Sequence, residues 1–237
     1  MSTERLISRF LDLVRIDSPS GEEAAVAHHC ATALEAMGFA VCTDDTMAVT
    51  GSDTGNLIAE LPGTVAGAPV LLLSAHLDCV EPCRGVEPVV RDGVVFSAGE
   101  TVLGADDKAG IAAIFEALER VLADEAPRGD IRVVLTVGEE RGLRGAKALD
   151  PASAAADLCL VLDADGEPGG IVTAAPTHYT FVAEFTGTAA HAGVEPEAGR
   201  SALVMAAAAI DAMVLGRLDE HTTANVGTIS GGTATNV

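Results

Sequence analysis

Apolar and polar residues follow two periods along the first part of the chain, and each period predicts a different element. Helical spacing predicts one helix over residues 3–16 and a second from Ser20, as its N-cap, to a stop at Gly38. The apolar run 69–73 predicts a strand that is buried on both faces. Such strands are typical of parallel or mixed sheets that are covered by helices.

The pattern continues as an alternation of strands and helices up to about residue 174. Four further strands are expected, over 38–43, 55–63, 131–138 and 157–163. A long periodic helix is expected over 108–124. A hairpin is expected over 86–100, since Asp92-Gly93 is a turn signal between two β-branched runs. This order predicts an α/β fold with a mixed, mostly parallel sheet flanked by helices.

The character of the chain changes near residues 174–176. A strand over 179–187, a helix over 201–218 and a strand over 224–232 predict part of a smaller α+β domain. The expected domains are therefore 1–174 and 175–237. A length of 237 residues also fits one domain and part of another, at about 150 residues per domain.

Composition and charge narrow the function. The 14 Lys and Arg against 35 Asp and Glu give a net charge of −21, which disfavours nucleic acid and anionic membrane surfaces as partners. The five scattered cysteines favour a reducing compartment over a disulfide framework. Without a secretory pattern at the start or an apolar run of membrane length, a cytoplasmic protein is expected.

Acidic residues and one histidine follow the apolar strands of the first part. They are His76 and Asp78, Asp106 and Asp107, Glu139 and Glu140, and Asp163 with Asp165 two residues later. Each pair taken alone has an ordinary explanation as a helix cap, a hydrogen-bonded histidine or solvated surface charge. Together they would converge on one edge of the sheet and repel one another without a cation.

Convergence therefore predicts a metal site. Histidine and carboxylates suit Zn²⁺, or Co²⁺ or Mn²⁺ in its place, and a carboxylate can bridge two ions. A spare glutamate beside the ions is the expected general base. Cys79 and Cys83, one pair without a second, are insufficient for a zinc site.

The motifs SAHLD, LGADDKAG and VGEERGLRGAK, in this order, resemble those of a known family. It is the family of zinc-dependent exopeptidases and amidohydrolases that includes peptidase T, the glutamate carboxypeptidases and acetylornithine deacetylase. The chain is most similar to the peptidase T-like branch. The resemblance implies a two-zinc site and a cis peptide bond between Asp106 and Asp107.

The resemblance also implies a role for each residue of the site. His76 would bind one zinc, Asp106 would bridge both, and Glu140 would bind the other. Asp163 would complete the site of His76, with Asp165 as an alternative. Asp78 would orient His76, and Glu139 would be the base and proton shuttle.

The second part resembles the lid or dimerisation domain of the family through residues 188–193 and 196–202. The resemblance implies that His191 reaches the active site of a neighbouring subunit in a homodimer and holds the substrate carbonyl or oxyanion. Asn236 would match a substrate-binding asparagine. From the residues alone, the favoured explanation of His191 is a helix-entry cap or a surface imidazole.

Family members continue beyond the lid and deliver a last zinc-binding histidine, whereas this sequence stops at Val237. The expectation is a fragment, or a chain completed by a separate polypeptide, with weakened zinc affinity and little turnover by itself. For the complete protein we expect hydrolysis of small peptides, as an aminopeptidase or tripeptidase. The alternatives are a carboxypeptidase, an N-acyl amino acid deacylase, or a noncatalytic metal-binding protein.

Overall fold

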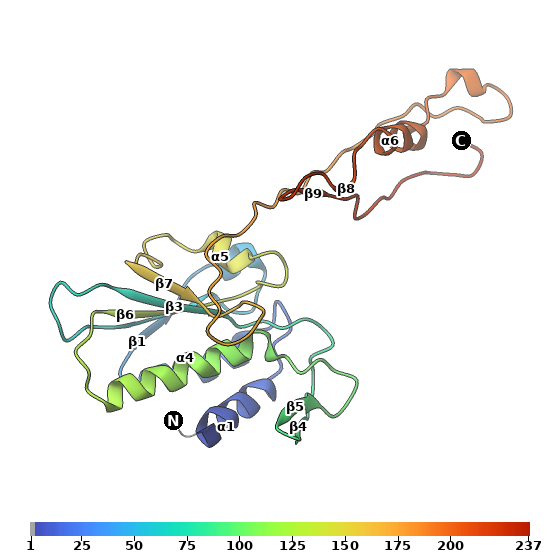
Figure 1. Cartoon of the computed structure of the whole chain (residues 1–237). Helices are drawn as coiled ribbons and strands as arrows, with labels where there is room; N and C mark the ends of the chain where they lie inside the picture. Colours follow the sequence, from blue (N-terminus) through green and yellow to red (C-terminus); the bar gives the residue numbers. More distant parts are fainter. Residues whose placement is uncertain (1–2) are drawn as a thin grey trace. The chain divides into compact units, whose positions relative to one another are not determined.

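The computed structural model describes residues 3–237, which fall into two compact units, 3–168 and 169–237. The first unit contains a five-stranded sheet in the order β1-β2-β6-β3-β7 (Figure 1). Its strands are β1 (Ala40–Thr43), β2 (Leu57–Leu61), β3 (Leu71–His76), β6 (Ile131–Thr136) and β7 (Leu158–Val161).

Strand direction confirms the expected fold class. Strand β3 pairs in parallel with both β6 and β7, whereas β2 runs antiparallel to its neighbours β1 and β6. Only β2 therefore opposes the other four strands, and the sheet is mixed and mostly parallel. The carboxyl ends of β3, β6 and β7 consequently lie at the same edge of the sheet.

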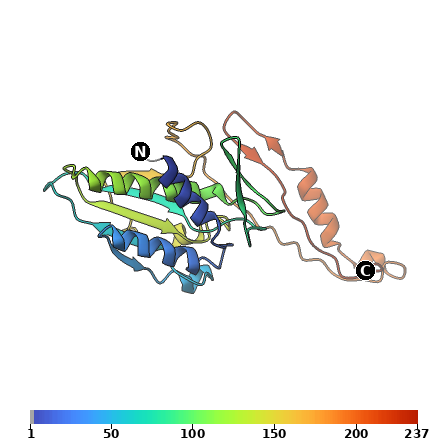
Figure 2. The ribbon, with the colours of Figure 1, turned by 90° about the horizontal axis from the view of Figure 1, so that it is seen from below.

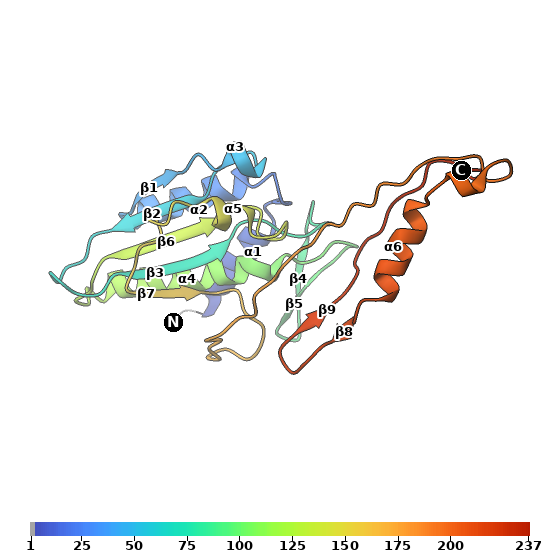
Figure 3. The ribbon, with the colours of Figure 1, turned by 90° about the horizontal axis from the view of Figure 1, so that it is seen from above.

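Helices cover both faces of this sheet. Helices α2 (Ala24–Ala36) and α4 (Ala105–Ala123) pack on one face, and α1 (Thr3–Val14) packs against α4 (Figure 2). The short helix α5 (Arg144–Ala148) lies over the opposite face and contacts α3 (Met47–Thr50) (Figure 3).

Successive side chains of β6 point to opposite faces of the sheet, and they contribute to a separate hydrophobic core on each face. Ile131, Val133 and Leu135 contribute to the large core on the side of α2 and α4. Val134 points to the other face, where it packs with Ile58 and Leu72. Burial of apolar side chains on both faces is what the continuous apolar runs predict.

The start of α2 differs from the expectation. The helix begins at Ala24, and its first N–H is accepted at 2.8 Å by Asp53 rather than by Ser20. The Ser20 hydroxyl instead donates to Asp78 at 2.6 Å, so a buried tertiary contact replaces the local cap. The stop at Gly38 is confirmed, since its φ of 91° is in the left-handed region that glycine adopts readily.

Two peripheral strand arrangements complete the first unit. The expected hairpin is β4 (Pro88–Arg91) paired with β5 (Val94–Ser97), with Asp92 and Gly93 at positive φ in the turn. Strand β7 is one of the two edge strands of the main sheet, and all four of its residues are exposed.

The second unit has less regular structure than the pattern predicts. It contains a short 3₁₀ turn η1 (Pro196–Ala198), α6 (Ala202–Asp211), and the paired strands β8 (Gly216–Arg217) and β9 (Thr223–Ala224).

The strands expected over 179–187 and 224–232 are wrong as strands in this structure. Alternation alone does not make a strand, because backbone groups need a paired neighbour. Within the described residues, 179–187 is followed by an isolated bridge at Thr188, and 224–232 shares only Ala224 with the short strand β9. Helix α6 stops before the expected 218, and Gly216 at φ 86° is incompatible with a continuing helix.

The division after Pro168 falls a few residues before the expected boundary at 174, and the roles assigned to the two parts stay predictions. None of the helices in residues 3–237 is long and apolar enough to cross a membrane.

Candidate metal centre

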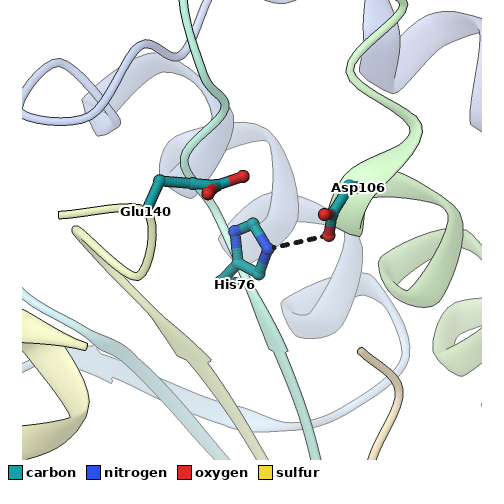
Figure 4. A group of neighbouring side chains, drawn as sticks. All are labelled: His76, Asp106 and Glu140. Carbon is teal, nitrogen blue, oxygen red and sulfur yellow. Dashed lines mark hydrogen bonds and ion pairs between the residues drawn. The ribbon is translucent and has the colours of Figure 1, made fainter. Parts of the chain in front are cut away.

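Three parallel strands and one helix deliver the candidate side chains to one place. His76 is the last residue of β3, Glu139 and Glu140 follow β6, and Asp163 follows β7. Asp106 lies in the first turn of α4. Figure 4 shows His76, Asp106 and Glu140 turned toward a common point from a strand end, a helix start and a loop.

Distances confirm that these groups meet. The ligand atoms of His76, Asp106 and Glu140 all lie within 4.8 Å of one another, and so do those of His76, Glu139 and Asp163. His76 belongs to both groups. Asp165 belongs to neither group among the residues that the structure describes, which favours Asp163 of the two aspartates.

The imidazole of His76 is oriented by its two ring nitrogens. Nδ1 lies 2.9 Å from the backbone carbonyl oxygen of Asp78, to which its N–H donates a hydrogen bond. Nε2 is 3.1 Å from Asp106 Oδ1 and 4.0 Å from Asp163 Oδ1. Nε2 is therefore the nitrogen that faces the carboxylates and the one that a metal ion would contact.

Asp78 is fully buried and contacts more than the histidine. Its side chain lies 3.4 Å from His76 Nδ1 and accepts hydrogen bonds from the backbone N–H groups of Glu139 at 2.9 Å and Glu140 at 3.2 Å. The Ser20 hydroxyl adds a further hydrogen bond. The sequence suggested the contact with His76. It contains no signal for the contacts with the loop after β6 that carries Glu139 and Glu140, the glutamate loop.

The first turn of α4, where the backbone departs from helical φ/ψ, places Asp106 and Asp107 on different sides. Their peptide bond is cis, as the resemblance implies. Asp106 has a side chain that is 71% exposed, whereas Asp107 is buried and accepts the N–H of His76 at 3.3 Å. Burial, together with the charges of Asp163 and Asp106, raises the pKa of Asp107 to about 7. Sequence reasoning assigned no role to this buried carboxyl.

The carboxylates disfavour each other's charge in the metal-free chain. Burial, and then the neighbouring acids, raise the pKa values of Glu139, Glu140 and Asp163 above their ordinary range. Burial alone would lower the pKa of His76, but Asp78, Asp106 and Asp107 raise it to about 10. A cation among these groups would relieve the repulsion, and an imidazole with several carboxylates is a donor set that fits Zn²⁺, Co²⁺ or Mn²⁺.

The second unit brings His191 and Asn236 together. The N–H of Ala192 donates to the backbone oxygen of Asn236 at 3.0 Å, and the N–H of Gly193 donates to His191 Nδ1 at 3.1 Å. Both residues are exposed. Their expected contacts with substrate stay predictions.

A family model described as peptidase family M28 matches residues 56–210 of this chain. The chain is 46% identical to the protein YqjE of Bacillus subtilis over 237 residues, and 33% identical to peptidase T of Escherichia coli over 190 residues. These alignments cover 100% and 62% of this chain, and 64% and 45% of the two relatives.

Two solved structures are similar over nearly the whole chain. Aminopeptidase PepT from Bacillus cereus superposes with a TM-score of 0.85 at 45% identity, and a tripeptidase from Staphylococcus aureus with a TM-score of 0.81 at 37% identity. In both cases the match covers 98% of this chain and 62% of the other. The chain thus spans less than two thirds of the length of these relatives.

Proposed function

Because this chain belongs to peptidase family M28, we propose that the protein carrying it hydrolyses peptide bonds in small peptides and needs divalent metal ions to do so. The observation that carries the proposal is the convergence of His76, Asp106, Glu139, Glu140 and Asp163 at one edge of the sheet. Four carboxylates this close together repel one another, and this repulsion favours a cation among them.

The proposed ligands are divided between two ions, with Zn²⁺ preferred and Co²⁺ or Mn²⁺ as substitutes. His76 and Asp163 would hold one ion, Glu140 the other, and Asp106 would contact both. A bound divalent ion of this kind polarises a carbonyl group and makes water more acidic. The protein's part is to keep the donors in place, as the contacts of Asp78 with His76 and the glutamate loop do.

Glu139 is the proposed general base. A carboxylate oxygen of Glu139 takes a proton from the attacking water and delivers it to the amine that leaves. Glu139 is only partly buried, and the raised pKa of its carboxyl favours accepting a proton at neutral pH. Its backbone N–H is fixed by Asp78, which limits where the carboxylate can lie.

The proposed enzyme class is an aminopeptidase or tripeptidase, and the proposed substrates are small peptides. The names of the two similar solved proteins support this proposal. His191 and Asn236 would hold the substrate from the lid of a homodimer. A cytoplasmic location is proposed as well, which the five free cysteines support.

The test compares the protein carrying residues 1–237 with its Glu139→Gln variant on dipeptides, tripeptides and N-acylated amino acids. We expect hydrolysis of small peptides by the unaltered protein, a loss of at least about a hundredfold in Glu139→Gln, and unchanged metal content. Glu35→Gln, at an exposed position of α2, is the matched control.

Full activity in Glu139→Gln would exclude this residue as the base. Cleavage of N-acylated amino acids alone would replace the peptidase with a deacylase, and bound metal with no hydrolysis of any substrate would favour a noncatalytic metal-binding protein.

A further inference from the structure

A second buried carboxylate, Glu23, lies beside the glutamate loop and has no part in the chemistry proposed above. Its side chain is fully inaccessible, although it comes just before the first turn of α2. The adjacent Glu22 is exposed and pairs with Arg84 at 2.8 Å. Two neighbouring glutamates therefore have opposite environments, and only one of them points into the protein.

The carboxylate of Glu23 joins three separate segments. Its Oε1 accepts the backbone N–H of Gly21 at 2.9 Å and that of Gly138 at 3.1 Å. Its Oε2 accepts the hydroxyl of Ser52, which is itself buried. Burial of a carboxylate is costly unless hydrogen bonds satisfy it, and here both oxygens are used.

Gly138 is the residue immediately before the proposed base and ligand. Four consecutive N–H groups in this part of the chain are each accepted by a buried side chain. The side chain of Asn56 accepts the N–H of Val137 at 3.1 Å, and that of Glu23 accepts the N–H of Gly138. The side chain of Asp78 accepts the N–H groups of Glu139 and Glu140. The N–H groups from 137 to 140 are thus held by side-chain acceptors rather than by a partner strand. On the carbonyl side, the oxygen of Gly138 accepts the backbone N–H of Arg144 at 3.0 Å.

One turn, residues 20–23, contacts two loops of the site. Ser20 donates to Asp78 in the loop after β3, and Glu23 accepts from Gly138 in the loop after β6. Because the position of a donor atom follows the backbone that carries it, loss of the bond to Gly138 would let the loop shift at Glu139 and Glu140.

We propose that Glu23 is a positioning residue for the metal centre, which acts by fixing the backbone at Gly138 and thereby the carboxylates of Glu139 and Glu140. The inference rests on the proposed function for its consequence in metal binding. What matters in Glu23 is the reach of its acceptor oxygen to Gly138 and not its charge.

Two conservative variants separate reach from charge. Glu23→Asp keeps the charge but shortens the side chain by about 1.5 Å, so its oxygen no longer reaches Gly138. Glu23→Gln removes the charge but keeps an acceptor at the same reach for Gly138, and its NH2 group can donate to the Ser52 hydroxyl, which turns to accept. Glu22→Asp makes the first substitution at the exposed neighbour and is the matched control.

Two readouts are needed. Hydrogen exchange of the backbone amides of Gly138, Glu139 and Glu140, with Val133 in β6 as an internal reference, measures the loop without metal. Titration with Co²⁺, followed by its visible absorption, measures metal affinity without substrate. We expect Glu23→Asp to exchange faster at these three amides, but not at Val133, and to bind Co²⁺ about tenfold more weakly. Glu23→Gln and Glu22→Asp should match the unaltered chain in both readouts.

Unchanged exchange and Co²⁺ affinity in Glu23→Asp would overturn the proposal, and so would a Glu23→Gln variant as impaired as Glu23→Asp. Faster exchange at Val133 as well would overturn it too, since the effect would then be general loss of stability. If the unaltered protein that carries this chain binds no Co²⁺, the proposed function fails, while the amide exchange still decides whether Glu23 holds the loop.

Discussion

Oδ1 of Asp78 accepts the backbone N–H of Glu139 at 2.9 Å, and this bond joins the loop after β3 to the loop after β6. The same carboxylate lies 3.4 Å from His76 Nδ1. The orientation of the imidazole and the position of the proposed base therefore depend on one buried side chain. Glu139 cannot move at its backbone without disturbing the group beside the histidine.

Replacement of this carboxylate should weaken metal binding although no proposed ligand is changed. Asp78→Asn leaves one acceptor oxygen where two serve the N–H groups of Glu139 and Glu140 and the hydroxyl of Ser20. We expect about a tenfold to hundredfold loss of affinity for Zn²⁺, measured by competition with a chelator. Asp12→Asn, at an exposed position of α1, should bind as the unaltered chain does. Equal affinity in both variants would contradict the positioning role of Asp78.

Metal binding should release protons and strengthen as the pH rises. The pKa of His76 is about 10 in the metal-free chain, so Nε2 carries a proton at neutral pH that must leave before the nitrogen can act as a ligand. Protons compete more strongly at lower pH. The affinity for Co²⁺ should therefore rise by about tenfold per pH unit between about pH 6 and 8, with more if a carboxyl also loses a proton.

Calorimetry in two buffers with different heats of ionisation, at one pH, counts the protons released. A count of one or more agrees with the protonated His76, and identical heats in the two buffers would contradict it.

A methyl group at Gly145 should destabilise the protein. A Cβ atom there would lie 2.3 Å from Asn56 Oδ1 and 2.4 Å from the backbone oxygen of Val137, so either the backbone or the buried amide must move. Gly145→Ala should reduce the free energy of unfolding by about 1–3 kcal/mol, measured by urea denaturation. Gly99→Ala, with open space around its Cβ, should differ by less than about 0.5 kcal/mol. Equal effects of the two variants would argue against the close packing at Asn56.

The core beneath the sheet should depend on Phe115 far more than the hairpin depends on its own phenylalanine. Phe115 is 1% exposed in α4, with the guanidinium of Arg9 5.7 Å from its ring centroid. Phe115→Ala should lower the free energy of unfolding by about 3–5 kcal/mol. Phe96→Ala, at a residue 47% exposed in β5, should cost less than about 1 kcal/mol in the same urea experiment. Similar losses in both variants would show that Phe115 is not part of the main core.

The fold of the first unit follows from patterns that are local in sequence. The apolar run before His76, the turn Asp92-Gly93 and the long periodic helix each indicate their element, because burial and turn geometry act over a few residues. The strands expected over 179–187 and 224–232 fail for the opposite reason. Pairing is a property of two segments, and the alternation within one segment does not reveal whether a partner is present.

The convergence of the site was also predictable, since parallel strands end at one edge of the sheet and acids follow three of them. The groups that hold the site in place were not. Ser20 and Glu23 match a helix start in sequence, and only the folded chain reveals that both side chains turn inward. A buried contact between distant segments leaves no periodic signal in the sequence. For this reason the contacts of Asn56 with Val137 and of Ser52 with Glu23 were not predictable either.

The pairing of β3 with β6 makes the site depend on contacts between distant parts of the chain. Leu71 lies opposite Ile131 across this pair, and the intervening chain must be closed into a loop before the first ladder bond forms. The donors reach one another only after that entropic barrier has been crossed, so a partly collapsed chain offers an ion little more than scattered acids. Metal binding at the proposed site would then be coupled to complete folding of the sheet, and a bound ion would in turn raise the resistance of the folded state to heat and denaturant.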